Sequence, residues 1–283
     1  MENKIKRAKV VMEALPYIQK FYGKIIVIKY GGAAMVDPEL KNAVMRDAVL
    51  LKYVGMHPII VHGGGPAINK YLKRKKIKTN FLHGQRVTDK ATLKAVAHVL
   101  GNKINKEIVH LIKKNGGKAK GFWGKKGHVI KARKYWHKDL DLGQIGEVIG
   151  VKYRFLLRWM KKGYIPVLSP IGVGKRGKLY NINADKAAAG IAAYLKAAKL
   201  ILLTDVKGVL DKKGELVSQI NTYRINKMIR TEELKGGMIP KVRSGLSAIR
   251  KGVENVHIID GRVLHALLLE IFTDVGIGTM VVK

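Results

Sequence analysis

Short apolar segments recur along the chain, and stretches with helical periodicity separate most of them. The apolar segments span 24–30, 58–62, 164–171, 199–205, 255–260 and 279–283. Apolar residues recur every three or four positions over 39–54, 67–77, 89–114, 184–197 and 239–252, which predicts amphipathic helices. Continuous apolar strands that alternate with helices are typical of a mainly parallel sheet with helices on both faces. The pattern therefore predicts an α/β fold.

Three segments depart from this alternation. Residues 4–20 carry apolar side chains at helical spacing, which predicts an N-terminal helix that packs on its own subunit or on a partner. Residues 117–153 alternate Val and Ile with Gly and Lys, which favours antiparallel hairpins inserted in the α/β frame. Gly172, Gly174 and Gly177 spell GxGxxG, but extended chain follows them where a dinucleotide site needs a helix, so we interpret this segment as a glycine-rich hairpin.

The strong positive charge of the chain could indicate a nucleic-acid-binding protein. The chain has 283 residues, with 55 Lys and Arg against 20 Asp and Glu, and its formal net charge is +35. Such a charge is common in nucleic-acid binders, but these cations are spread through nearly every segment and form no basic and aromatic stacking platform. We therefore expect nonspecific attraction to polyanions and no specific nucleic-acid partner.

The absence of cysteine and of long apolar runs excludes several kinds of site and of protein. The chain contains no cysteine, which excludes disulfides, thiolate metal sites and a cysteine nucleophile. No apolar run reaches the roughly 18 to 20 residues that a membrane-spanning helix needs, and the first twenty residues lack the apolar core of a signal peptide. We expect a cytoplasmic protein without a membrane partner.

Glycine-rich loops follow the first two predicted strands. The first strand ends in Lys29-Tyr30-Gly31-Gly32, and the second ends in His62-Gly63-Gly64-Gly65-Pro66. Glycine lets backbone N–H groups approach an anion closely, and proline suits the first position of a helix, whose amino end attracts negative charge. One such loop can be a simple tight turn. Two at adjacent strand ends favour a phosphate cradle.

A polar segment, Asn181-Ile182-Asn183-Ala184-Asp185, enters an alanine-rich helix. Asn183 is expected to cap this helix, and Asp185 lies in its first turn, where helix N–H groups favour a carboxylate. Asn181 and Asp185 are therefore close together near a strand end, where ligands of open α/β sheets bind. Both could face a ligand.

Seven blocks, in order along the whole chain, resemble the acetylglutamate kinases of the amino acid kinase family. They are KYGGAAM (29–35), VHGGGPAI (61–68), GQRVTDK (84–90), YNINADKAAA (180–189), LILLTDVKGVL (200–210), GGMIPKV (236–242) and LLEIFTDVGIGTM (268–280). The resemblance implies a three-layer α/β/α sandwich around a mainly parallel open sheet, with an N-terminal helix extension. The implied reaction is ATP-dependent phosphorylation of the side-chain carboxylate of N-acetyl-L-glutamate, in arginine biosynthesis. The alternatives are another acyl amino acid or carbamate kinase of this fold, or a noncatalytic polyanion-binding protein.

The resemblance also implies roles for individual residues. Lys29 and Lys241 would stabilise the transferring phosphoryl group and its leaving side, with Asp185 holding both lysines. On the substrate side the resemblance points to Arg86 and Asn181 at the α-carboxylate, and to the backbone of Gly64 and Gly65. On the nucleotide side it points to Gly31, Gly32, Asp205, Val206, Lys207, Gly208, Val209 and Leu210. A substrate carboxylate is already ionised at pH 7, so no general base is needed.

By the same resemblance, residues 1–23 form an oligomerisation helix, 24–180 bind the acyl amino acid, and 181–283 bind the nucleotide. Magnesium would arrive with ATP, and no metal ligands are expected from the protein. The implied assembly is a homohexamer, a trimer of dimers, inhibited by L-arginine bound near Tyr17, Lys199, Glu270 and Gly276. Two departures from the family pattern, at His83 and at Phe122-Trp123, concern the packing around the substrate.

Overall fold

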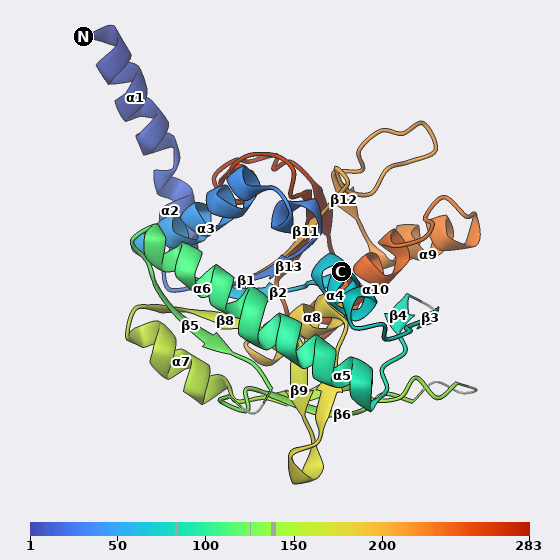
Figure 1. Cartoon of the computed structure of the whole chain (residues 1–283). Helices are drawn as coiled ribbons and strands as arrows, with labels where there is room; N and C mark the ends of the chain where they lie inside the picture. The colour runs from blue at the N-terminus through green and yellow to red at the C-terminus, as the bar shows by residue number, and fades with distance from the viewer. Residues whose placement is uncertain (83, 125, 137–139) are drawn as a thin grey trace.

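A large sheet runs through the centre of the computed structural model (Figure 1), which describes residues 1–82, 84–124, 126–136 and 140–283. It has eight strands. The strand order is β12-β14-β13-β11-β1-β2-β8-β5. The bounds are β1 Ile25–Tyr30, β2 His57–His62, β5 Lys118–Phe122, β8 Tyr164–Leu168, β11 Lys199–Thr204, β12 Gln219–Ile220, β13 Asn255–Asp260 and β14 Thr279–Val281. Every pairing is parallel except that of β13 with β14. The predicted mainly parallel sheet is confirmed.

Helices cover both faces of this sheet, as the continuous burial of its central strands requires. In β1, Val27 belongs to one hydrophobic core, while Ile26 and Ile28 belong to the other. The first core packs against α7 (Tyr153–Lys161), α8 (Ala184–Tyr194), α9 (Thr222–Arg230) and α10 (Met238–Arg250). The second packs against α3 (Pro38–Tyr53), α4 (Gly65–Arg74), α5 (Lys90–Ala97), α6 (Asn105–Lys114) and α11 (Ala266–Ile271). The predicted three-layer α/β/α sandwich is confirmed.

The predicted helix over 89–114 contains an irregular segment. A seven-residue π-helix, His98–Ile104, lies between α5 and α6. Such segments widen the helix and occur frequently at functional sites. Here it brings Leu100 and Ile104 against the backbone of Gly64, in the second glycine loop.

The prediction of antiparallel hairpins over 117–153 was partly wrong. β5 pairs in parallel with β8 at the edge of the main sheet, because the connection between these two strands contains helix α7, which returns the chain to the end of the sheet where β5 begins. The antiparallel pair is β6 (Ile130–Lys134) with β7 (Gly146–Val151). These strands form a second sheet with β9 (Ile171–Val173) and β10 (Leu179–Asn181).

The predicted glycine-rich hairpin is confirmed. β9 and β10 are antiparallel, and the short 3-10 turn Lys175–Gly177 joins them. The apolar run 164–171 is not one strand, since Ser169 and Pro170 separate β8 from β9 and send the chain from the main sheet into the second. A separate two-stranded hairpin, β3 (Phe81–Leu82) with β4 (Gln85–Arg86), lies near the start of α5. His83 and Lys125 lie outside the described residues.

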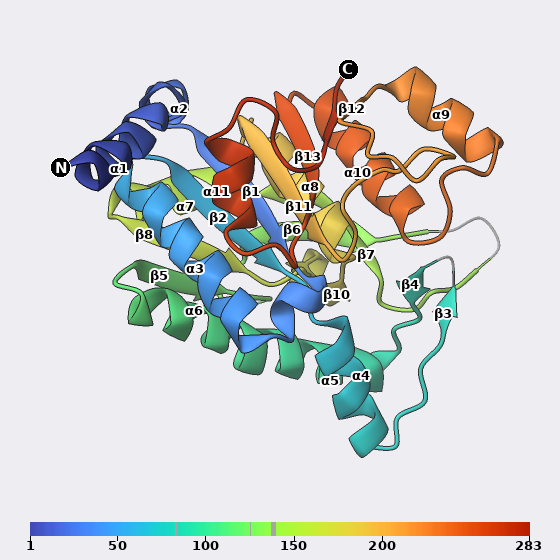
Figure 2. The same ribbon diagram turned by 90° about the horizontal axis from the view of Figure 1, so that it is seen from above.

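The predicted N-terminal helix is two helices, α1 (Glu2–Glu13) and α2 (Leu15–Phe21), with Pro16 at the start of the second. Phe21 of α2 is buried in the core. By contrast, α1 extends away from the rest of the molecule (Figure 1), and Ile5, Val11 and Met12 are exposed. Figure 2 shows α1 and the β3–β4 hairpin at opposite sides of the molecule. None of the described helices is both long and apolar enough to cross a membrane.

Candidate active site

A cavity of about 240 Å³ lies at the carboxyl ends of β1 and β2. Both predicted glycine loops line it, together with the β3–β4 hairpin and the start of α8. This is the edge where ligands of open α/β sheets bind. The residues that the resemblance assigned to substrate, nucleotide or catalysis and that line the cavity are Lys29, Gly31, Gly32, Gly64, Gly65, Arg86, Asn181 and Asp185.

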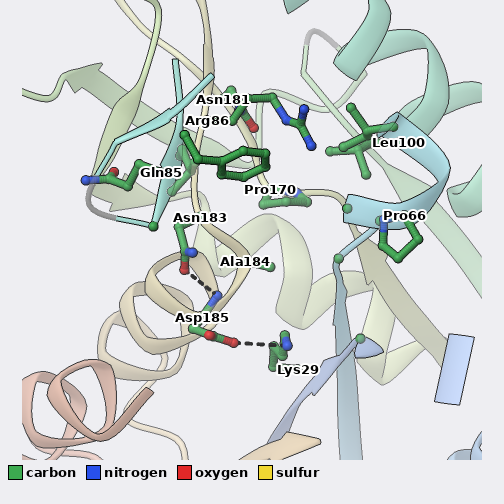
Figure 3. Close-up of a pocket in the computed structure, with 18 of the residues that line it drawn as sticks. Lys29, Pro66, Gln85, Arg86, Leu100, Pro170, Asn181, Asn183, Ala184 and Asp185 are labelled. Atoms are coloured by element: carbon green, nitrogen blue, oxygen red, sulfur yellow. Dashed lines mark hydrogen bonds and ion pairs between the residues drawn. The ribbon is translucent and has the colours of Figure 1, made fainter. Parts of the chain in front are cut away.

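Lys29 and Asp185 lie at one end of the cavity (Figure 3), and Lys241, which does not line it, contacts Asp185 as well. The Lys29 ammonium lies 3.1 Å from Asp185 Oδ1, and the Lys241 ammonium lies 3.2 Å from Asp185 Oδ2. Lys29 also donates to the carbonyl of Leu203 at 3.5 Å. One carboxylate therefore holds two lysines from different elements, β1 and α10, as the sequence analysis expected.

Burial and the neighbouring charges both shift the pKa values of Lys29 and Asp185. Burial lowers the pKa of Lys29, and the neighbouring Lys241 lowers it further, although Asp185 partly opposes both effects. Burial alone would raise the pKa of Asp185, but the two ammonium groups outweigh it and hold that pKa below its ordinary value. The carboxylate is therefore ionised and keeps the lysines in place.

The start of α8 positions Asp185. The Asn183 side chain accepts hydrogen bonds from the backbone N–H groups of Asp185 (3.0 Å) and Lys186 (3.1 Å), so the predicted cap is confirmed. The cap stops the extended chain of β10 and turns Asp185 into the first helical turn, facing Lys29 (Figure 3).

Each glycine loop contains a glycine at which a Cβ atom would meet close neighbours. At Gly32, φ is +72° and a Cβ atom would collide with the Asp205 carboxylate, which accepts a hydrogen bond from the Ala33 N–H. At Gly64, a Cβ atom would lie 2.5 Å from Ile104 Cδ1 and 2.6 Å from Leu100 Cδ2. The positive φ requires glycine at position 32, whereas a Cβ atom at position 64 would displace the ends of two side chains. The backbone of both glycines lines the cavity, where its amides are suited to anionic oxygens.

The other end of the cavity contains an arginine without an acidic partner. Arg86 is only 6% exposed, and its guanidinium donates to Asn69 Oδ1 at 2.5 Å and to Thr79 Oγ1 at 3.4 Å. It stacks at 4.5 Å over the ring of Phe81, and no carboxylate among the described residues forms an ion pair with it. A buried guanidinium with neutral partners is suited to a ligand carboxylate.

Asn181 lies beside Arg86 at this end of the cavity (Figure 3). Its side-chain amide donates to the hydroxyl of Thr88 at 3.1 Å, and that hydroxyl donates to the Arg86 carbonyl at 2.7 Å. The structure thus brings together the two residues that the resemblance assigned to one carboxylate.

Sequence reasoning missed several residues of this site. Asn69 and Phe81 contact the Arg86 guanidinium, and Leu100 lines the cavity from the π-helix. The helical pattern over 89–114 contained no signal for a π-helix, so the sequence could not have placed Leu100 there. The aromatic Phe81, five residues before Arg86 in a short polar segment, was the signal that could have been used.

Residues 205–210, the predicted nucleotide segment, do not line the cavity, whereas Gly31 and Gly32 do. Asp205 contacts the first glycine loop through Ala33 and Gly32. Val206, Lys207 and Leu210 are exposed, and Gly208 is buried. The side chain of Val209 belongs to the core, and its backbone N–H donates to Thr279 Oγ1 at 2.8 Å, so its side chain is not available to a ligand.

The four predicted effector residues line a second cavity, of about 500 Å³. Tyr17, from α2, donates to Asp274 Oδ1 at 2.5 Å. Lys199 lies 2.9 Å from His257 Nε2, and His257 Nδ1 contacts the Glu270 carboxylate. Gly276 has a φ of +66° and packs against Glu270.

Comparison with known proteins identifies the family of this chain. The model of the amino acid kinase family matches residues 24–260. This chain belongs to the amino acid kinase family. The acetylglutamate kinase of Carboxydothermus hydrogenoformans is 53% identical over 99% of both chains. That of Methanocaldococcus jannaschii is 50% identical over 100% of this chain and 98% of its own length.

A solved structure shows the same fold. The N-acetylglutamate synthase of Neisseria gonorrhoeae, complexed with coenzyme A and N-acetyl-glutamate, superposes with a TM-score of 0.87 at 24% identity. The match covers 96% of this chain, which spans 62% of the synthase. This structure therefore has the same fold as the chain. The family model and the kinase relatives show that the chain is a kinase, which transfers a phosphoryl group.

Proposed function

We propose that this kinase phosphorylates the side-chain carboxylate of N-acetyl-L-glutamate with ATP, as a step of arginine biosynthesis. Relatives of about 50% identity over the full length carry the name acetylglutamate kinase. The observation that carries the proposal is the distribution of charge in the cavity. Arg86 lies at one end and Lys29 at the other (Figure 3), and apolar side chains such as Ile68 and Leu100 also line the cavity.

A dicarboxylate with an uncharged acyl group matches this distribution. The α-carboxylate pairs with Arg86 and Asn181, and the side-chain carboxylate reaches the glycine loops and Lys29. Acylation removes the positive charge of the amino group, which would otherwise be repelled by the cations of the site. In the proposed division of the chain, 24–180 bind the acyl amino acid and 181–283 bind the nucleotide, with Asn181 at the boundary between them. β1 of the first part pairs with β11 of the second, and we propose that the transfer takes place at the carboxyl ends of these strands.

In the proposed reaction, a carboxylate oxygen bonds to the γ-phosphorus, and the bond from that phosphorus to the bridging oxygen of ADP breaks. Lys29 and the amides of Gly32 and Gly64 stabilise the charge on the transferring oxygens. Lys241 stabilises the negative charge that develops on the leaving ADP oxygen, and Asp185 holds both lysines. The attacking oxygen carries no proton, so no residue has to remove one.

Magnesium fits this site as a companion of the nucleotide. Among the described residues there is no group of three His, Asp or Glu side chains that could hold a metal ion. When bound to the phosphates of ATP, the ion neutralises part of their charge. Asp205, beside the first glycine loop, is the acidic side chain of the predicted nucleotide segment.

A coupled assay of ADP release tests the proposal. The purified chain is given ATP and magnesium with N-acetyl-L-glutamate, and parallel reactions contain glutamate, N-acetylaspartate or carbamate. We expect turnover with N-acetyl-L-glutamate and at least about tenfold lower kcat/KM with the others. Glutamate lacks the acyl group, N-acetylaspartate is one methylene shorter, and carbamate has no α-carboxylate to pair with Arg86. Faster turnover of carbamate or of another acyl amino acid would assign the chain to that activity.

We also propose that the second cavity binds L-arginine as an inhibitor and that the N-terminal helices join dimers into a hexamer. The cavity contains the carboxylates of Glu270 and Asp274 and the ammonium of Lys199, which match a ligand with a guanidinium and a carboxylate. Helix α2 contributes Tyr17 to this cavity, while Ile5, Val11 and Met12 of α1 are exposed. Assembly and inhibition would therefore be connected.

Light scattering and an arginine titration test this second proposal. The full chain is expected to be a hexamer whose activity falls with arginine, and deletion of residues 1–20 is expected to give active dimers that arginine does not inhibit. Tyr17→Phe, which removes only the hydroxyl, should remain hexameric and lose sensitivity. A full-length dimer with activity unchanged up to millimolar arginine would contradict the proposal and leave the kinase reaction intact.

A further inference from the structure

A buried threonine connects the two residues at the carboxylate end of the cavity. Thr88 is completely buried, and it does not line the cavity. Its hydroxyl contacts the backbone of Arg86, two residues earlier, and the side chain of Asn181, 93 residues later. One side chain therefore joins the β3–β4 hairpin to β10.

The polarity of these bonds determines the orientation of the Asn181 amide. A carbonyl can only accept, so the Thr88 hydroxyl must donate its single proton to Arg86 O. The lone pairs of the hydroxyl then require a donor, which is the NH₂ group of Asn181 and not its oxygen. With one N–H engaged, Asn181 keeps its second N–H and its oxygen for the cavity.

The backbone holds Thr88 in place on both sides. Its N–H donates to the Leu142 carbonyl at 3.0 Å, and its carbonyl accepts from the Gln144 N–H at 2.6 Å. The next residue, Asp89, caps α5 by accepting from the Thr92 N–H at 2.7 Å. Because the main chain is held in this way, the hydroxyl is a rigid reference point for Arg86 and Asn181.

We propose that Thr88 is a positioning residue that sets Arg86 and Asn181 at the spacing that one substrate carboxylate requires. The inference rests on the proposed function, since it concerns the α-carboxylate of an acyl amino acid. Thr88 itself touches neither substrate nor reacting atoms. Its loss should therefore weaken binding of the acyl amino acid and leave the nucleotide end unchanged, because that end depends on Lys29, Asp185 and Lys241.

Steady-state kinetics of three variants test the proposal. Thr88→Val removes the hydroxyl and keeps the shape, and it leaves the buried Arg86 carbonyl without that donor. We expect the KM for N-acetyl-L-glutamate to rise by about tenfold to a hundredfold, the size of one unsatisfied buried group. The KM for ATP should change less than about twofold. Thr88→Ser keeps the hydroxyl and should restore the substrate KM to within about threefold of wild type.

Thr92→Val is the matched control, since Thr92 is also a buried threonine, in α5, and it does not line the cavity. It should lose thermal stability as Thr88→Val does and leave both KM values unchanged. If Thr88→Val keeps the wild-type substrate KM, or if Thr88→Ser is impaired to the same degree, the positioning role is refuted. If the wild-type chain itself neither binds nor phosphorylates N-acetyl-L-glutamate, the proposed function is what fails, and this inference falls with it.

Discussion

Replacing Asp185 by Asn tests whether one buried carboxylate organises the transfer site. At 3.1 and 3.2 Å, and with an effective dielectric constant of about 20, each lysine contributes roughly 5 kcal/mol of attraction. Most of this attraction offsets the cost of burying the three charges. Removing one partner of a buried pair typically costs 3 to 5 kcal/mol. We therefore expect Asp185→Asn to lower the free energy of unfolding by about 3 kcal/mol and the melting temperature by roughly 6 to 12 °C.

The same substitution should affect the rate in a pH-dependent way. Burial already lowers the pKa of Lys29, and Asp185 opposes that effect. Without the carboxylate the pKa of Lys29 falls further, so the lysine loses its proton at a lower pH than in the wild type. We expect kcat at pH 7 to fall by at least about a hundredfold, the scale of one lost charge stabiliser. The loss should grow as the pH rises from 6 to 9.

Stability at low pH provides a second readout. The pKa of Asp185 in the folded chain is below its unfolded value, so the stabilisation is fully present above about pH 4 and is lost as the pH falls through the folded pKa. The stability difference between wild type and Asp185→Asn should therefore shrink in acid. Chemical denaturation at pH 3 and pH 7 measures this difference.

The matched control is Glu107→Gln, which removes a carboxylate from the partly exposed pair with Lys41. This variant should lose no more than about 1 kcal/mol of stability and no activity. The reasoning about Asp185 would be refuted if Asp185→Asn kept more than about a tenth of the wild-type kcat with a flat pH profile. Stability equal to that of Glu107→Gln would equally contradict it.

Three further predictions concern single residues of the site. Lys241→Ala should lower kcat at least about a hundredfold in the coupled assay with little change in the KM for acetylglutamate, because its charge acts on the leaving side. Arg86→Ala should raise the KM for acetylglutamate and leave that for ATP unchanged; the opposite result would reverse the assignment of the two halves. Gly64→Ala should lower the melting temperature by several degrees more than Gly65→Ala, because only the former Cβ would collide with Ile104 and Leu100. Equal melting temperatures in differential scanning calorimetry would show that the π-helix yields.

Local features of the site could be predicted from the sequence. The glycine loops after β1 and β2, and the capping of α8 by Asn183, all appear in the structure where the pattern placed them. The resemblance added Lys241, Arg86 and the effector residues. The loops and the cap could be predicted because a strand end, a helix cap or a tight turn is determined by a few neighbouring residues.

Tertiary structure decided how distant parts meet. The pairing of β5 with β8, the contribution of Leu100 from a π-helix and the link from Thr88 to Asn181 were not visible in any local pattern. Each depends on which segments become neighbours once the sheet has its strand order. Apolar periodicity predicts that one face of a helix or strand is buried, but it does not identify the element that packs against that face. A residue such as Thr88 therefore acquires its role only when the folded backbone places its hydroxyl between two partners.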